Sequence, residues 1–150
     1  WTTFSDHLAH HFNALVERRE SGINAGRPIF CHAYAYLTPR DAPAFPGFGP
    51  WLIKAMRLYD IPPAQWADLS QAFIDRLHAL ITQIIADINA RARRDMRIVL
   101  IDTRKEVTPA ASGTTGTSND WVNEIHPTAG GYRKLAARWR SAVDADPAFV

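Results

Sequence analysis

The sequence has a single cysteine, Cys31, and no long apolar run. One cysteine cannot form an internal disulfide, so the fold must be stable without covalent cross-links. The position of Cys31 inside a predicted strand indicates a small core residue rather than a reactive thiol. The longest apolar runs are only a few residues, whereas a helix that spans a bilayer needs about 20. We therefore predict a soluble chain with no membrane span.

An excess of charge of one sign is also lacking. The 17 lysines and arginines and the 15 acidic residues leave a formal net charge of +2. The densest group of cations follows a predicted helix and consists of Arg91, Arg93, Arg94 and Arg97. Cations at the C-terminal end of a helix are stabilised by the helix dipole. Because no wider basic patch accompanies them, we predict no nucleic-acid partner.

Apolar residues recur at helical spacing in several segments. They predict an amphipathic helix over residues 4–16 and a short helix over residues 51–59. The Pro62-Pro63 pair opens a long helix, because proline is tolerated in the first turn. Its apolar stripe runs from Trp66 to Ile88, and we interpret that stripe as core. A last helix is predicted over residues 128–143.

Two segments are typical of buried strands. Residues 28–36 are rich in aromatic and apolar side chains, and residues 98–101 are a continuous aliphatic run. The intervening helices predict a parallel βαβ unit within an α/β layer pattern. Residues 39–50 and 108–119 are predicted loops. Because two parallel strands do not make a stable sheet, we expect further strands from a preceding part of the polypeptide or from another chain.

The most informative stretch is residues 119–132, which read Asn-Asp-Trp-Val-Asn-Glu-Ile-His-Pro-Thr-Ala-Gly-Gly-Tyr. It resembles the last conserved block of SGNH (GDSL-like) hydrolases, in which an acid and a histidine lie on a loop before the C-terminal helix. Residues 28–36 and 98–102 resemble two sheet strands of that family. The resemblance implies a flavodoxin-like three-layer α/β fold with a parallel sheet. Residues 1–150 would be the C-terminal portion of one such domain, incomplete by itself.

The resemblance implies that His126 is the general base of an ester hydrolase. Such a histidine takes the proton of a serine hydroxyl that attacks the ester carbonyl, then returns it to the leaving alcohol. The family has aspartate three residues before the histidine, whereas this chain has Asn123, which accepts a hydrogen bond but carries no charge. We expect the charged Asp120 to orient His126, with Asn123, Glu124 and Asp102 as the remaining candidates.

Two motifs of the family are missing, namely the Gly-Asp-Ser nucleophile motif and the Gly-x-Asn-Asp motif of the oxyanion hole. Ser112 and Ser118, in the loop before Asp120, are the nearest alternatives, but neither follows a strand in a tight turn. Since the chain begins at Trp1, we expect the motifs in a preceding half of the polypeptide or in another chain. We predict that the isolated chain is inactive and that the complete enzyme acts on a small-molecule ester without a cofactor.

Other residues with possible ligand roles come from the first predicted strand and helix. His32, Tyr34 and Tyr36 alternate toward the carboxyl end of the strand, where open α/β sheets bind ligands. They are candidate substrate-binding residues, and a packed aromatic face is the equal alternative. The three histidines within residues 7–11 have metal-site spacing, but no carboxylate or cysteine completes the ligand set, so we predict no metal.

A non-catalytic function is the main alternative. A domain could keep the hydrolase scaffold and bind a partner or a glycan through Tyr34 and Tyr36, or through the loop of residues 39–50. The missing catalytic motifs favour this interpretation, and the retained His-Pro-Thr block favours the enzyme.

Overall fold

The computed structural model describes residues 2–91 and 97–147. Its elements follow in the order α1 (Thr2–Glu20), β1 (Ile29–His32), α2 (Leu52–Leu58), the 3₁₀ turn η1 (Pro63–Gln65), α3 (Trp66–Asn89), β2 (Ile98–Ile101) and α4 (Ala129–Asp144). The four predicted helices and two predicted strands are thus confirmed as elements. The first strand is shorter than predicted, because it ends at His32 instead of residue 36.

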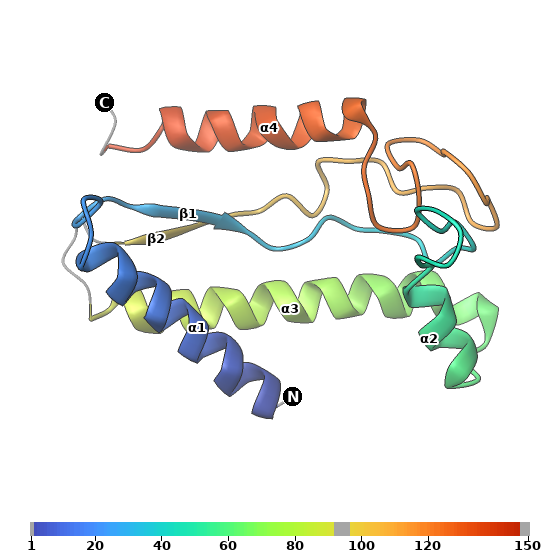
Figure 1. The fold of residues 1–150 in the computed structure, drawn as a ribbon, viewed down its shortest axis with the longest axis horizontal. Helices are drawn as coiled ribbons and strands as arrows, with labels where there is room; N and C mark the ends of the chain where they lie inside the picture. The colour runs from blue at the N-terminus through green and yellow to red at the C-terminus, as the bar shows by residue number, and fades with distance from the viewer. Residues whose placement is uncertain (1, 92–96, 148–150) are drawn as a thin grey trace.

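The two strands form a small parallel sheet, which confirms the predicted α/β pattern at this level. Ile29 pairs with Ile98 and His32 pairs with Ile101. Figure 1 shows α4 on one side of the strands and α1 and α3 on the other. Within the described residues the sheet has only these two strands.

The larger part of the core lies between the sheet and the C-terminal half of α3. It contains Ile81, Ile84, Ile85 and Ile88 of α3 together with Ile98 of β2. The four isoleucines of α3 recur at steps of three and four, so they share the face of α3 that meets the strands. The prediction that the apolar stripe of α3 is core is confirmed here. It is wrong at the N-terminal end of α3, where Leu69 and Phe73 are nearly half exposed.

A second, smaller core lies beneath the loop that follows β2. Trp121, which is 1% exposed, packs there with Ala35, Leu37, Val107 and Ala110. Leu52, Ile125 and Leu135 pack around this group. Residues 119–126 are therefore anchored to the body of the protein through a large buried ring, although they belong to no helix or strand.

The arginine cluster has structural partners where it is described. Arg91 donates through Nε to the Asp87 carbonyl at 2.9 Å, and Arg97 forms an ion pair with Asp146. Arg93 and Arg94 lie outside the described residues. The contacts of Arg91 fit the interpretation of these cations as groups that cap the end of α3.

No helix in the described ranges is long and apolar enough to cross a membrane.

Candidate functional site

The loop that carries His126 is closed by its own backbone. Trp121 forms bridges with Ser118 and with Pro127, and the Val122 N–H donates to the His126 carbonyl at 2.9 Å. The Thr128 N–H donates to the Asp120 carbonyl at 2.7 Å. The loop is therefore a compact double turn with the imidazole near its exit into α4.

Thr128 is the N-cap of α4, close to the predicted start of this helix. Its backbone is extended, and its hydroxyl accepts a hydrogen bond from the Gly131 N–H at 3.0 Å, which satisfies one of the free N–H groups of the first turn. A Cβ atom on Gly131 would lie 2.6 Å from the Asp120 carbonyl oxygen and 2.9 Å from Pro127 Cβ. Glycine at this position therefore lets α4 approach the loop closely.

The ring of His126 is held by Asn123. His126 Nδ1 lies 3.0 Å from Asn123 Oδ1, and the same oxygen accepts the backbone N–H groups of Ile125 at 3.1 Å and of His126 at 2.9 Å. Those two N–H donors identify this atom as the amide oxygen rather than the amide nitrogen. Because the oxygen only accepts, Nδ1 carries the proton and Nε2 keeps a free lone pair.

Asn123 is buried, whereas His126 is exposed. The orienting group is thus shielded from water while the imidazole reaches the surface. A reactant can therefore approach Nε2 from outside the loop.

Asp120, the acid that we expected to orient His126, has other partners. Its carboxylate accepts the Thr108 N–H at 2.7 Å and the Lys134 ammonium at 2.6 Å. The Lys134 ammonium and the Thr108 N–H hold the pKa of Asp120 below its ordinary value. The carboxylate therefore stays ionised and ties the loop to α4, and the structure brings Asn123 rather than Asp120 to the His126 ring.

Glu124 is also occupied elsewhere. Its side chain is 1% exposed, and its carboxylate accepts backbone N–H groups from Arg40 at 3.2 Å, Leu52 at 2.7 Å and Ile53 at 2.8 Å, as well as from Trp51. A buried carboxylate is stabilised only when such donors surround it. Glu124 therefore joins the His126 loop to the start of α2.

Arg40 also holds the His126 loop, and it does so as a hydrogen-bond donor to backbone carbonyl groups. Its guanidinium is 1% exposed and donates to the carbonyl oxygens of Asn123 at 2.7 Å and of Trp121 at 3.4 Å, and to that of Gly116. Burial lowers the pKa of this guanidinium, and the nearby Glu124 carboxylate opposes that effect. The backbone of the residue that orients His126 is thus held by a buried cation.

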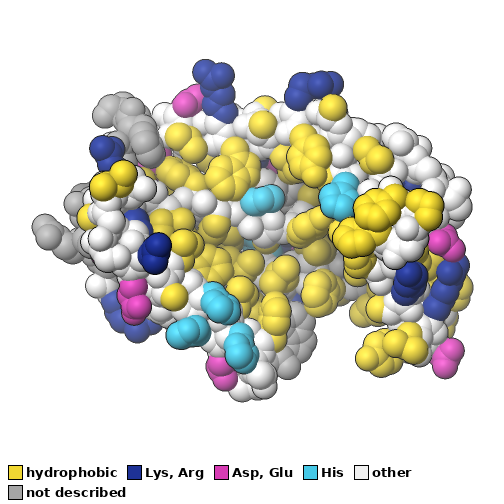
Figure 2. All heavy atoms as spheres, viewed as in Figure 1, with side chains coloured by type: hydrophobic (Ala, Val, Ile, Leu, Met, Phe, Trp, Pro, Cys, Tyr) yellow, Lys and Arg dark blue, Asp and Glu magenta, His cyan; other side chains and the backbone are white. Residues whose placement is uncertain are grey.

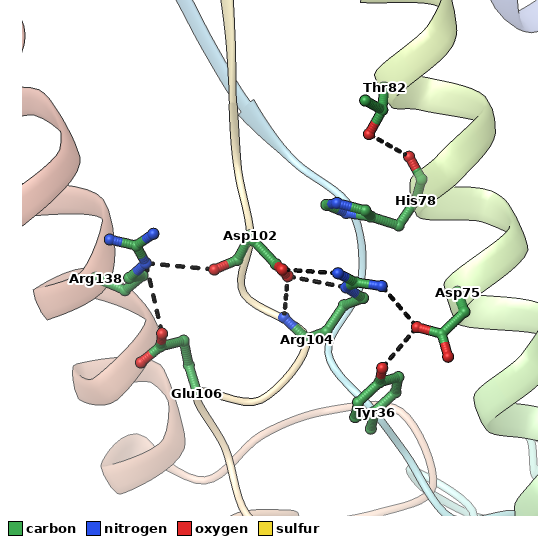
Figure 3. Close-up of polar contacts among 8 residues, drawn as sticks. All are labelled: Tyr36, Asp75, His78, Thr82, Asp102, Arg104, Glu106 and Arg138. Carbon is green, nitrogen blue, oxygen red and sulfur yellow. Dashed lines mark hydrogen bonds and ion pairs between the residues drawn. The ribbon is translucent and has the colours of Figure 1, made fainter.

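Asp102 belongs to a separate network at the end of β2. Figure 3 shows Arg104 between Asp102 and Asp75, with ion pairs of 2.8 and 2.6 Å. Tyr36 donates its hydroxyl proton to Asp75 at 2.6 Å. The Arg104 guanidinium holds the pKa of Asp102 far below its ordinary value. Asp102 and Tyr36 therefore join the segments that follow β1 and β2 to α3, and within the described residues neither side chain is hydrogen bonded to His126.

His32, Tyr34 and Tyr36 do not share one face, contrary to the sequence-based expectation. His32 Nδ1 lies 3.0 Å from Thr103 Oγ1 and its ring meets Trp139 of α4 edge to face, while Tyr36 reaches Asp75 of α3. The physical reason is that β1 ends at His32, so the alternation of strand side chains stops there.

Tyr34 is the member of this group that lies close to His126. Its hydroxyl donates to the Ile125 carbonyl at 2.5 Å, and its ring stacks on Trp121 at 6.4 Å. Tyr34 remains 37% exposed. It therefore supports the His126 loop while remaining partly exposed to solvent.

No serine within residues 2–91 and 97–147 is hydrogen bonded to His126. Of the two serines considered from the sequence, Ser118 accepts the Ala111 N–H through Oγ at 3.0 Å. Burial raises the pKa of Cys31 to about 11, so this thiol is protonated at neutral pH, and it packs against the main core. The described residues also include no group of three histidine, cysteine or acidic side chains that could hold a metal ion.

Sequence reasoning missed the buried pair of Arg40 and Glu124 and the aromatic residues Phe48 and Trp51. The sequence could have suggested Phe48 and Trp51, because residues 42–53 contain no charged side chain other than Lys54 just beyond them. Nothing in the sequence indicated that Arg40 and Glu124 pack together, since Arg40 lies 84 positions before Glu124 and a charged residue is normally expected at the surface.

Comparisons with known proteins add no assignment: no family model matches the chain, and no curated protein or solved structure matches it.

Proposed function

We propose that this chain is the histidine-bearing part of a carboxylic-ester hydrolase that works through a serine acyl-enzyme. The proposal depends on one observation, the 3.0 Å contact between His126 Nδ1 and Asn123 Oδ1. It leaves the surface-exposed imidazole in the tautomer that a general base requires, with a free lone pair on Nε2.

The reaction would use the imidazole twice. Nε2 takes the proton of the serine hydroxyl while Oγ bonds to the ester carbonyl carbon. The bond between that carbon and the alcohol oxygen then breaks, and the imidazolium returns the proton to the alcohol. In the second half, water gives a proton to Nε2 while its oxygen bonds to the acyl carbon. The bond between that carbon and serine Oγ then breaks, and the imidazolium returns the proton to Oγ, which releases the acid and restores the serine.

Asn123 would act as the positioning residue. In serine proteases, replacing the orienting aspartate by asparagine lowers turnover about ten-thousandfold because the wrong tautomer is favoured. In this chain the two backbone donors hold the amide oxygen toward the ring, so the correct tautomer is kept. What is lost relative to aspartate is the negative charge that stabilises the imidazolium.

The nucleophile and the oxyanion donors would come from residues outside these 150, in the same polypeptide or in another chain. Figure 2 supports a further segment packed against this chain, because hydrophobic side chains are gathered across the middle of one face, between α4 and α3. Two parallel strands also need neighbours to be stable. We therefore propose that this chain contributes part of an SGNH-type three-layer fold, with further strands beside its two-stranded sheet.

The test compares the isolated chain with the longer polypeptide or with the chain plus its partner. We expect hydrolysis of p-nitrophenyl acetate only in the larger assembly, and we expect His126→Ala to abolish it. His126-dependent turnover by the isolated chain would refute the shared site. Turnover by the larger assembly that survives His126→Ala would refute the hydrolase itself.

Variants of Asn123 test its role. Asn123→Asp keeps the acceptor and adds the charge, so we expect kcat to be equal or higher. Asn123→Ala removes the acceptor of Nδ1, so we expect kcat to fall about a hundredfold or more, with KM little changed. Equal kcat values for Asn123→Ala and the parent would contradict this role.

A binding module is the second candidate. It is supported by the absence of a serine partner for His126 among the described residues and by the exposed ring of Tyr34. A serine-directed fluorophosphonate probe separates the two candidates, because it labels a hydrolase in the larger assembly and leaves a binding module unlabelled.

A further inference from the structure

Three aromatic side chains before α2 form a row of rings that ends at His126. The rings of Phe45 and Phe48 are stacked at 4.8 Å with an interplanar angle of 5°. Phe48 meets Trp51 edge to face at 5.4 Å, and Trp51 meets the His126 imidazole at 5.8 Å and 75°. We name Phe45, Phe48 and Trp51 the aromatic ridge.

The outer part of the ridge is exposed but held in a defined geometry. Phe45 is 60% exposed and Phe48 is 49% exposed. The Ala44 N–H donates to the Phe48 carbonyl at 3.0 Å, and the Phe48 N–H donates to the Phe45 carbonyl at 2.9 Å. Gly47 has φ of 82°, which few other residues adopt. The turn thus presents two parallel rings to solvent, although burying them would be favourable.

The inner end of the ridge is tied to the same buried carboxylate as the His126 loop. The Trp51 N–H donates to Glu124, which lies two positions before His126 in the chain. A Cβ on Gly49 would lie 2.8 Å from the Trp51 ring, so glycine lets the backbone lie against the indole. The distance between ridge and imidazole is therefore fixed by buried contacts rather than by surface side chains.

The chemistry of the ridge defines what it can bind. Residues 42–53 include no charged side chain, so a sugar phosphate or another charged group would find no partner there. Flat, exposed rings bind apolar or aromatic groups. Their contact with the imidazole makes this surface continuous with the proposed catalytic site.

The position next to the imidazole also selects one side of the ester. The leaving alcohol oxygen must receive its proton from Nε2, so it lies within hydrogen-bond reach of the ring. The ring of Trp51 lies 5.8 Å from the imidazole between centroids, so a substituent on that oxygen can extend along the aromatic ridge. On the basis of the proposed function, we infer that the aromatic ridge binds the apolar alcohol group of the ester, and that the substrates are esters of alkyl or aryl alcohols.

Binding can be tested on the chain itself with hexyl acetate and methyl acetate as probes. In a nitrogen-15 NMR titration we expect hexyl acetate, and not methyl acetate, to shift the Trp51 indole and His126 signals. Phe45→Ala/Phe48→Ala should weaken hexyl acetate binding about tenfold, because two apolar surfaces are lost. Tyr59→Ala removes a ring that is 74% exposed at the end of α2, and it should bind normally.

Activity of the larger assembly supplies the second readout. With the acyl group fixed as acetyl, kcat/KM should rise from methyl to hexyl alcohol, and the ridge variant should remove that rise. With the alcohol fixed as methanol, lengthening the acyl chain should change kcat/KM equally in the parent and in the variant. Phe45→Ser alone, at the most exposed ring, gives the same comparison if the double variant is poorly folded by circular dichroism.

Four results would overturn the inference. Absence of Trp51 and His126 shifts with hexyl acetate is one, and unchanged hexyl acetate binding by Phe45→Ser is another. A preference that follows acyl length instead of alcohol length is the third. The last is self-association of the chain that Phe45→Ser abolishes, which would show that a second copy covers the ridge. In each case, loss of hydrolysis in His126→Ala would still support the proposed function, so the two failures are distinguishable.

Discussion

Two adjacent glycines at the start of α4 should respond in opposite ways to the same substitution. Gly130 and Gly131 both lie in the first turn of the helix. A Cβ on Gly130 would meet its nearest atom, Thr128 Oγ1, at 3.5 Å, which is an ordinary contact. A Cβ on Gly131 would lie 2.6 Å from the Asp120 carbonyl oxygen, so either α4 or the loop must move.

The magnitudes follow from two opposing effects. Replacing glycine by alanine in a helix stabilises it by about 0.5–1 kcal/mol, which is the expected effect of Gly130→Ala. Forcing an extra carbon into a packed site costs about 1–3 kcal/mol, so Gly131→Ala should reduce the free energy of unfolding by about 1–2 kcal/mol net. The gain in helix propensity is common to both variants, so they should differ by the cost of the extra carbon, about 1–3 kcal/mol.

Urea unfolding followed by circular dichroism measures this difference directly. In a domain of this size, about 1 kcal/mol corresponds to a change in Tm of about 2–4 °C, so thermal unfolding gives an independent check. If Gly131→Ala were as stable as Gly130→Ala, the close approach of α4 to Asp120 would be wrong. The predicted positioning of the His126 loop by α4 would then be refuted as well.

Three further perturbations have defined outcomes. Glu124→Ala leaves buried N–H groups of Arg40 and Ile53 without acceptors, so urea unfolding should show the free energy of unfolding lowered by about 2–6 kcal/mol. A loss below about 0.5 kcal/mol, the range of surface substitutions, would contradict the buried hydrogen bonds of Glu124. The depressed pKa of Asp120 means that its contribution is present above about pH 4 and is lost as pH falls through the folded pKa. Stability of the parent and of Asp120→Asn should therefore converge in acid, and a constant gap would disprove the pairing. Burial lowers the pKa of His32, so protonation destabilises the fold as pH falls below about 6.5. His32→Gln should make stability less dependent on pH between about 7 and 5, and an unchanged slope would contradict the lowered pKa of His32.

Local patterns in the sequence were sufficient to predict the elements of the fold. Helix α3 follows from the spacing of its apolar residues, because burial on one face imposes a period on the chain, and strand β2 follows from its continuous aliphatic run. Thr128 is the N-cap of α4, and this role depends on neighbours within three residues. The parallel pairing follows from a strand, a helix and a strand in succession.

The sequence by itself also placed a histidine beside a helix start, but it could not determine which side chain orients that histidine. Charge favoured Asp120, yet its carboxylate lies against Lys134 and Thr108, and the amide of Asn123 reaches the ring. These choices depend on contacts between residues distant in the chain, such as the buried Arg40 guanidinium on the Asn123 carbonyl. A local pattern specifies where a loop begins and ends, whereas only the packing of several segments fixes the directions of the side chains within it.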